Sequence, residues 1–487
     1  MIRKIHYTVY LVYIIDPIHN YMCGVIGILN NSEPVCPNII HGLNMLQHRG
    51  SDSTGIMTIN NNIFYSHKQL GKVNDVYTPE NTKYLQGNIG IGHVRYCTMG
   101  QINTEQAHPL YTNTPYGIAL VHNGNLTNTE ELINIVEKDY RHINSSSDSE
   151  LLLNLFAGLI PKKDDITNED IFDTITKIME LCKGSFSVII MMNKVGLIAF
   201  RDKNGIRPLC YCNTNCNTNN NYIVASESSC IDALNSNNIK IHDVHPGECI
   251  IFRPENMEKQ MVATNPKWKP CIFEYIYFAR PDSTINNILV YDARIKMGEA
   301  FANKIMSQFS NIIDDIDVVM PVPETSRIYG LCISQILNKP YYEGFIKNHY
   351  ISRTFIMPNQ ETRVNNIKMK LNTIKKEFHG KNILIIDDSI VRGNTSLQLI
   401  KMAKEAGVKK IYFGSIAPPI RYPNVYGIDI QKSEHLIAYN KTHQEISEAL
   451  GIEQVIYNDL DHIINACSQL TENKIEFETC CFDGIYL

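Results

Sequence analysis

Four motifs in the first half of the chain carry side chains that could bind and cleave an amide. Cys23 opens an apolar run and offers a thiol nucleophile. Arg95 ends a later apolar run, where its guanidinium could fork onto a carboxylate, and Asp148 could take an ammonium group. The amide of Asn123 and the backbone N–H of Gly124 could form an oxyanion hole. Together these residues suit a site that hydrolyses glutamine.

Each of these features has a simpler alternative when it is taken alone. Cys23 could be a small buried hydrophobe, and Asp148 could cap a helix. Asn123-Gly124 could form a hairpin turn, and Arg95 could make a surface ion pair. Their occurrence together, with the motif His48-Arg49-Gly50 between them, favours the glutamine site.

The most specific string in the chain, Ile383–Ser396, lies in the second half. An apolar strand runs into Asp387 and Asp388, and a glycine-bearing loop then leads into a helix predicted to begin near Thr395. Loop N–H groups and a helix N-terminus could hold a phosphate. The two acids could hold ribose hydroxyls, directly or through Mg²⁺. An Asp-Asp pair alone would indicate only a capped helix, and no Gly-Lys-Ser/Thr follows that would indicate a Walker loop.

The first half must position its side chains on many short strands. Apolar runs recur between turn signals from Cys23 to about Arg253, which predicts stacked antiparallel sheets. The expected strands are Cys23–Leu29, Gly55–Ile59, Ile89–Tyr96, Gly117–His122, Phe186–Met191, Gly196–Arg201, Tyr222–Ser226 and Glu248–Phe252. Apolar residues at helical spacing predict helices over Glu130–Glu137 and Asp148–Leu159.

The second half changes rhythm from about Ile285, where strands and helices alternate. This predicts a parallel, doubly wound sheet, after a connection over Pro254–Pro270. The expected strands are Ile316–Met320, Asn382–Ile386 and Lys410–Ile416. The helix after the phosphate loop should place Leu397, Ile400 and Ala403 along one face.

Composition excludes several classes of protein. The 487 residues are 44% hydrophobic and 20% charged, with a net charge of −5 and no basic run, which argues against a nucleic-acid binder. No apolar run reaches the ~18 residues of a membrane helix. The 14 cysteines are scattered, which favours reduced thiols and a cytoplasmic protein.

The first half resembles the N-terminal nucleophile glutamine amidotransferases, a four-layer αββα fold. The resemblance implies that Cys23 is the nucleophile and that its own α-amino group is the base. Asn123 and Gly124 would then form the oxyanion hole, while Arg95 and Asp148 would bind glutamine. Met1–Met22 would be a leader that must be removed, although an arm, a targeting segment or a misassigned start before Cys23 are alternatives.

The second half resembles the type I phosphoribosyltransferases, which use phosphoribosyl pyrophosphate (PRPP). The resemblance implies a metal near Ser326, in the turn Met320–Arg327, and at both aspartates. A loop over Lys347–Gln360 would close over PRPP, although a charged loop could be plain surface. The implied PRPP-binding residues are Lys347, Tyr350, Arg353, Asp387, Asp388, Ser389, Arg392, Gly393, Asn394, Thr395 and Ser396.

The two halves in this order resemble the amidophosphoribosyltransferase family of purine biosynthesis. The resemblance implies an enzyme that uses glutamine, PRPP and Mg²⁺ to make 5-phosphoribosylamine, with an ammonia channel, purine nucleotide inhibitors and a homotetramer or dimer. It divides the chain into a leader (1–22), a glutaminase domain (23–253), a linker (254–284), a transferase domain (285–457) and a tail (458–487). The alternative is a glutaminase whose second half only senses PRPP.

Some relatives in this family carry a 4Fe–4S cluster on four cysteines. Cys271 stands at the first of these positions, whereas the second holds Asn424. Near the C-terminus only Cys481 is in register, with Cys480 beside it. Such clusters are normally held by four thiolates, so no cluster is expected.

Overall fold

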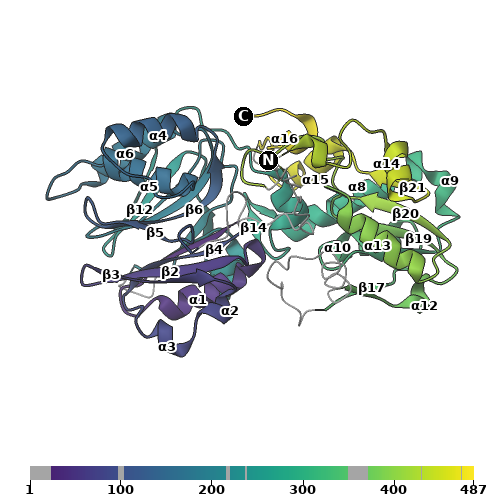
Figure 1. Cartoon of the computed structure of the whole chain (residues 1–487), viewed down its shortest axis with the longest axis horizontal. Helices are drawn as coiled ribbons and strands as arrows, with labels where there is room; N and C mark the ends of the chain where they lie inside the picture. The colour runs from purple at the N-terminus through teal and green to yellow at the C-terminus, as the bar shows by residue number, and fades with distance from the viewer. Residues whose placement is uncertain are drawn as a thin grey trace, which may run out of the picture.

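The computed structural model describes residues 23–96, 104–214, 220–235, 239–348, 371–428, 430, 432–472 and 474–487. The chain forms two halves that lie side by side (Figure 1). The purple and blue half carries two stacked sheets, and the green and yellow half carries a smaller sheet between helices. The C-terminus returns to the region between the two halves.

Two antiparallel sheets build the first half. One has the strand order β11-β9-β10-β1-β4-β2-β3, and the other has the order β13-β12-β8-β7-β6-β5. The first contains β1 (Gly24–Leu29), β2 (Ser53–Asn60), β3 (Ile63–Leu70), β4 (Ile89–Arg95), β9 (Cys210–Asn213), β10 (Tyr222–Ala225) and β11 (Ile241–Asp243). The second contains β5 (Leu110–Thr112), β6 (Ile118–Leu126), β7 (Gly184–Met192), β8 (Gly196–Arg201), β12 (Glu248–Phe252) and β13 (Met257–Met261).

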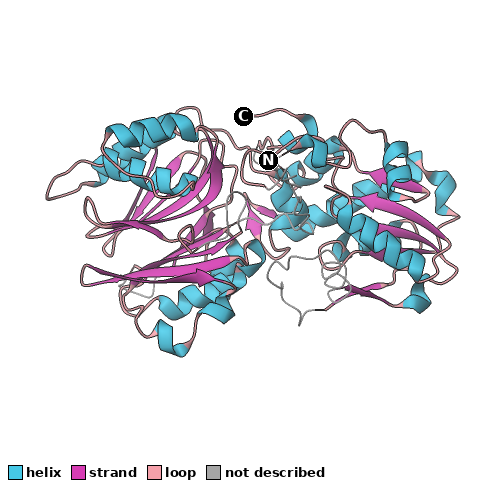
Figure 2. Cartoon of the chain, viewed as in Figure 1, coloured by secondary structure: helices cyan, strands magenta, loops and turns pink. Residues whose placement is uncertain are grey.

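Helices cover the outer face of each sheet, which gives the four layers visible in Figure 2. On β1, Val25 and Leu29 pack into the core between the sheets, whereas Ile26 and Ile28 pack toward α1 (Cys36–Met45) and α7 (Ser228–Leu234). The second sheet is covered by α4 (Thr129–Lys138), α5 (Asp148–Leu159) and α6 (Asn168–Leu181). Both faces of the inner strands are therefore buried, which explains their continuous apolar runs, and the predicted αββα fold is confirmed.

A four-stranded parallel sheet forms the second half, with the strand order β16-β19-β20-β21. On β19, Ile383 and Ile385 face one core, and Leu384 and Ile386 face the other. Such two-sided burial is typical of a doubly wound sheet, and the predicted class is confirmed. The strands are β16 (Val318–Pro321), β19 (Asn382–Asp387), β20 (Lys410–Ser415) and β21 (Gln454–Tyr457). The flanking helices are α8 (Val290–Gln308), α10 (Arg327–Ile336), α12 (Lys375–Phe378), α13 (Asn394–Glu405), α14 (His443–Leu450) and α15 (Leu460–Ser468).

Several features differ from the sequence-based expectations, and short strands such as β5, β9, β11 and β21 were not predicted. Strand β3 went unpredicted because it is half exposed and carries polar residues on both faces. The expected connection over Pro254–Pro270 contains β13, which pairs with β12. On α13, Leu397 is 42% exposed, and Leu399 packs into the core with Ile400. The expected apolar face was therefore wrong at Leu397.

Among the described residues, the helices are all too short or too polar to cross a membrane.

Candidate active sites

Cys23 lies directly before β1 and is half buried. Its Sγ is 3.9 Å from the Tyr96 carbonyl oxygen, and its own carbonyl accepts a hydrogen bond of 3.0 Å from Arg49 Nε. Burial raises the pKa of the Cys23 thiol, although a backbone hydrogen bond with Tyr96 and the charge of Arg95 oppose the increase. A raised pKa leaves little thiolate at neutral pH, so Cys23 would need a base to act as a nucleophile.

Asn123 and Gly124 lie inside β6, paired with Ser187 and Phe186 of β7. This placement rules out the hairpin-turn alternative. Asn123 is 1% exposed, and its Nδ2 has no hydrogen-bond partner among the described residues, which leaves the amide free to donate to a ligand. Gly124 has φ +153°, and a Cβ there would lie 2.1 Å from the Ser185 carbonyl oxygen. Only glycine fits this position.

Arg95 ends β4, the strand that pairs with β1, whereas Asp148 opens the helix α5. The Arg95 backbone packs against Gly50, where an added Cβ would lie 2.5 Å from the Arg95 carbonyl carbon. The Arg95 guanidinium donates to Gln106 Oε1 at 2.9 Å. Asp148 is the first residue of α5 rather than its N-cap, and its Oδ2 accepts from Leu126 N at 3.0 Å. That bond ties the carboxylate to the end of β6, which we call the oxyanion strand after the role expected of Asn123 and Gly124.

Two buried histidines lie close to this site, His122 on β6 and His93 on β4. His122 Nδ1 lies 2.9 Å from Ser149 Oγ and 3.9 Å from Asp148 Oδ2. Burial lowers the pKa of His122, and it lowers the pKa of His93 to about 3. These rings therefore pack as uncharged groups at neutral pH. In the sequence, His122 was expected only as the end of a strand, and its side chain was given no role.

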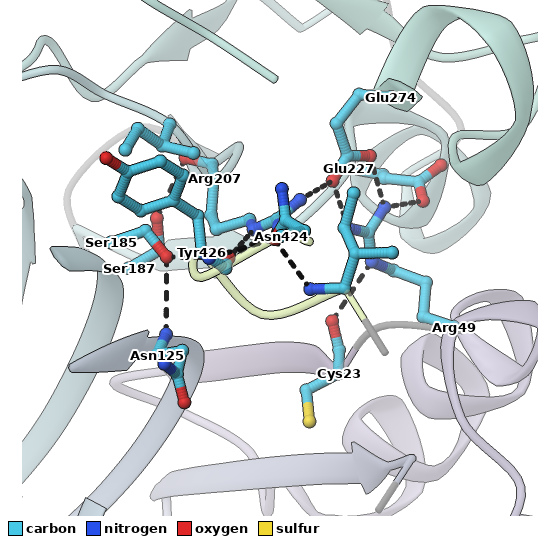
Figure 3. A network of polar contacts seen from close by, with 12 residues as sticks. Cys23, Arg49, Asn125, Ser185, Ser187, Arg207, Glu227, Glu274, Asn424 and Tyr426 are labelled. Carbon is cyan, nitrogen blue, oxygen red and sulfur yellow. Dashed lines mark hydrogen bonds and ion pairs between the residues drawn. The ribbon is translucent and has the colours of Figure 1, made fainter. Parts of the chain in front are cut away.

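Arg49, Glu227 and Glu274 form a fully buried charge cluster behind Cys23 (Figure 3). Arg49 donates to Glu227 Oε1 at 2.6 Å and to the two Glu274 oxygens at 2.8 and 3.0 Å. His48 also lies 2.7 Å from Glu227 Oε1. Burial alone would raise the pKa of Glu227, but His48 and Arg49 lower it below its usual range. Neither glutamate was predicted, because they lie about 180 and 225 positions from Arg49 in the sequence.

The second site lies at the carboxyl end of β19. Asp387 Oδ1 accepts from Ser326 Oγ at 3.3 Å and from Asp388 N at 2.9 Å. Ser389 Oγ donates to Asp388 Oδ1 at 2.8 Å. Burial, then the charge of Asp388, raises the pKa of Asp387 well above its usual value, and burial raises the pKa of Asp388 to about 6. The structure thus brings all three predicted metal-site residues together.

The glycine loop after these acids turns directly into α13. Gly393 is the N-cap, with φ +82°, and a Cβ there would lie 2.5 Å from Ile437 Cδ1. The N–H groups of the first turn, from Asn394 onward, face away from the helix body. Thr395 Oγ1 is buried without a hydrogen-bond partner among the described residues. A helix N-terminus with a spare buried hydroxyl suits an anion.

Of the remaining predicted residues, Arg392 and Ser396 belong to this loop and to the start of α13, whereas Lys347 lies on another strand. Lys347 is exposed at the end of β17 (Phe345–Lys347), which pairs with β18 (Leu371–Thr373). Tyr350 and Arg353 lie outside the described residues. Arg392 is half buried, and Ser396 is buried near the start of α13.

The positions that correspond to cluster cysteines in some relatives also meet in space. Asn424 Nδ2 contacts Cys480 Sγ at 3.4 Å and Cys481 Sγ at 3.5 Å. Cys271 is fully buried and forms an isolated bridge with Glu478. Across the part of the chain that the structure describes, no three His, Cys, Asp or Glu side chains are grouped to hold a metal ion.

Fold and sites together define a glutamine amidotransferase joined to a phosphoribosyl-binding domain. A family model described as "Glutamine amidotransferase domain" matches residues 93–233. The chain is 46% identical to the amidophosphoribosyltransferase of Pasteurella multocida, over 96% of this chain and 93% of that protein. The Escherichia coli and Saccharomyces cerevisiae enzymes of the same name are 46% and 45% identical, over 96% of this chain and 92% of each protein.

Two solved structures are similar over almost the whole chain. One is the Bacillus subtilis glutamine PRPP amidotransferase complexed with ADP and GMP, with a TM-score of 0.82 and 32% identity over 95% of this chain and 97% of that chain. The other is titled as the allosteric regulatory enzyme of purine biosynthesis, with a TM-score of 0.83 and 32% identity over 95% and 96% of the two chains. The chain belongs to the amidophosphoribosyltransferase family, and it is an enzyme with glutaminase and transferase activities.

Proposed function

We propose that Cys23 attacks the side-chain amide of glutamine, that ammonia leaves, and that water then releases glutamate from the thioester. The Asn123 amide and the Gly124 N–H would hold the oxyanion, Arg95 the α-carboxylate and Asp148 the α-ammonium. The spare Nδ2 of buried Asn123 supports its role most directly.

The base in this scheme is the α-amino group of Cys23, whose ordinary pKa of about 8 suits proton transfer at neutral pH. A free amine at Cys23 requires that residues 1–22 be removed or not be made. Intact-mass measurement of the purified enzyme tests this, and the expected chain begins at Cys23. An active enzyme that retains residues before Cys23 would contradict the proposed base.

In the second site, ammonia would attack C1 of the PRPP ribose, and pyrophosphate would leave. Asp387 and Asp388 would hold the ribose hydroxyls, while Ser389 and the run Arg392–Ser396 would hold the 5′-phosphate. The turn containing Ser326 would hold pyrophosphate, and Lys347, Tyr350 and Arg353 would close over it. The observation that supports this best is the anion-binding loop directly after the paired acids.

The donor set at this site fits Mg²⁺. Two carboxylates and one hydroxyl are hard oxygen ligands of the kind Mg²⁺ prefers. Burial holds the pKa values of both acids above the usual range, and a divalent cation would favour their ionised forms. Asp387, Asp388 and Ser326 would hold the ion, and Mg²⁺, when bound, neutralises charge on the departing pyrophosphate.

The proposal also covers how the enzyme is regulated and how its subunits assemble. Purine nucleotides would inhibit the enzyme, as the ADP and GMP complex of the Bacillus subtilis relative suggests. The enzyme would be a cytoplasmic homotetramer or dimer that passes ammonia between its sites. Titration with ADP and GMP should lower the rate of 5-phosphoribosylamine formation, and an unchanged rate would exclude feedback by these two nucleotides.

Product stoichiometry tests the whole reaction. With glutamine, PRPP and Mg²⁺, glutamate and pyrophosphate should form near one to one, and glutamate should form much more slowly without PRPP. Glutamate release without any pyrophosphate would instead identify a glutaminase whose second half only senses PRPP.

A further inference from the structure

Residues 424–428 of the second half lie against the oxyanion strand of the first half. We call them the docking loop. Asn125 Nδ2 donates to the Val425 carbonyl at 3.0 Å. A Cβ on Gly427, which has φ +101°, would lie 3.2 Å from the carbonyl of Gly124. The docking loop therefore contacts the same two residues that follow the buried Asn123 amide.

The carbonyl of Tyr426 is the main polar contact of this loop with the glutaminase half (Figure 3). It accepts from Arg207 Nε at 2.9 Å and from Ser185 Oγ at 2.8 Å. Ser185 Oγ in turn accepts from Asn125 N at 3.2 Å. The backbone directly after the oxyanion glycine is thus held by a chain of hydrogen bonds that ends in the docking loop.

Arg207 extends the same network to the nucleophile. Its NH1 is 3.6 Å from Glu274 Oε1, and Glu274 holds Arg49, which donates to the Cys23 carbonyl at 3.0 Å. Arg207, Glu274 and Arg49 are all buried. The docking loop consequently reaches both sides of the glutamine site, the cysteine and the oxyanion strand.

Asn424 fixes the shape of the loop. Its Oδ1 accepts from Tyr426 N at 2.8 Å and from Ile428 N at 3.1 Å. Its Nδ2 points to the thiols of Cys480 and Cys481, and the side chain is buried. These two backbone bonds fold the loop so that the Tyr426 carbonyl faces Arg207 and Ser185.

We infer that Asn424 is a positioning residue for glutamine hydrolysis, although it lies in the half that binds PRPP. This inference rests on the proposed role of Asn123 and Gly124. An asparagine side chain that shapes the docking loop would set the orientation of the Gly124 N–H and of Cys23. It touches neither substrate, so its effect should fall on glutamine turnover and not on the transfer of free ammonia.

Kinetics of Asn424→Ala and Asn424→Asp test this. Asn424→Ala removes the acceptor of both backbone bonds, and it should lower kcat for glutamine at least ~10-fold while KM for glutamine changes less than ~3-fold. Ammonium-dependent pyrophosphate release should stay within ~2-fold of wild type. Asn424→Asp keeps the acceptor oxygen and should restore most of the glutamine turnover. The inference fails if Asn424→Ala leaves glutamine kcat unchanged, or lowers both activities equally.

Two further variants make the test independent of folding. Ser185→Ala removes the hydroxyl between Asn125 N and the Tyr426 carbonyl, so it should give the same selective loss if Asn424→Ala is insoluble. Asn382→Ala is the matched control, because Asn382 is also buried and its Nδ2 also makes two contacts, both with Asp315. It should leave the ratio of the two activities unchanged. A selective loss in Asn382→Ala, or none in Ser185→Ala, would overturn the inference, whereas wild type without glutaminase activity would instead refute the proposed function.

Discussion

Buried charge is handled differently at the two sites. Behind Cys23, Arg49 has two glutamate partners within 3.0 Å, and burial lowers the pKa values of His93 and His122. At the end of β19, Asp387 and Asp388 are held by hydroxyls and a backbone N–H, and the pKa values of both acids are raised. The charges behind Cys23 are therefore paired within the fold, whereas the two acids at the end of β19 are held by neutral donors.

Removal of the nucleophile should give the largest separation between the sites. Cys23→Ala should lower glutamine-dependent product formation at least ~10³-fold, because the thioester can no longer form. Pyrophosphate release with ammonium should remain, since the second site is intact. Cys36→Ala, a buried thiol on α1, is the control and should retain both activities.

A substitution in the oxyanion strand should also lower glutamine turnover, but by less than the loss of Cys23. The Cβ of Gly124→Ala would meet the Ser185 carbonyl at 2.1 Å, so the strand must shift. We expect glutamine kcat to fall ~10²–10³-fold, as for loss of an oxyanion donor. Glutamine turnover close to wild type would show that the Gly124 N–H is not part of the hole.

Substitution of Asp388 should impair transfer at the second site and leave glutamine hydrolysis at the first site intact. Asp388→Asn should lower transfer from both glutamine and ammonium by ~100-fold or more, because charge stabilisation worth several kcal/mol is lost. Basal glutamate release without PRPP should be unaffected. If instead only glutamine-dependent transfer fell, Asp388 would not belong to the PRPP site.

Loss of the buried cation behind Cys23 should lower the free energy of unfolding. Arg49→Met removes the cation that buried Glu227 and Glu274 share, which should cost about 3–5 kcal/mol of unfolding free energy. Denaturant unfolding measures this. Arg141→Met, whose arginine bonds backbone carbonyls and Asp139 near the surface, should cost much less. Equal losses would show that the buried cluster contributes no more than a surface pair.

The mildest test uses pH. In the metal-free enzyme the raised pKa of Asp388, about 6, means that the folded state keeps a proton that the unfolded state releases between about pH 4 and 6. Stability should therefore fall as pH rises through this window, and Asp388→Asn should flatten the slope. The apparent Mg²⁺ affinity should fall up to ~10-fold per pH unit below about 6, because binding must displace the proton. A pH-independent affinity between pH 5 and 7 would contradict the raised pKa.

The sequence predicted local features well and long-range partners poorly. Asn123-Gly124, Asp387-Asp388 and the glycine-bearing loop that follows each occupy a few consecutive residues, so the sequence alone marks them as candidate site residues. Glu227 and Glu274 are single acids without a motif, and only the tertiary packing of distant segments brings them to Arg49. The same holds for the Tyr426 carbonyl, because no side-chain pattern marks a backbone acceptor. Leu397 was misplaced because helical spacing alone does not fix which face is buried.

The most direct test of two separable sites in one chain is a comparison of nitrogen sources. Glutamate and pyrophosphate are measured for wild type, Cys23→Ala and Asp388→Asn, each with glutamine and with ammonium. We expect Cys23→Ala to release pyrophosphate with ammonium only, and Asp388→Asn to release glutamate from glutamine with little pyrophosphate from either source. If Cys23→Ala released no pyrophosphate with ammonium although it is folded, or Asp388→Asn lost basal glutamate release, the division of labour between the two sites would be contradicted.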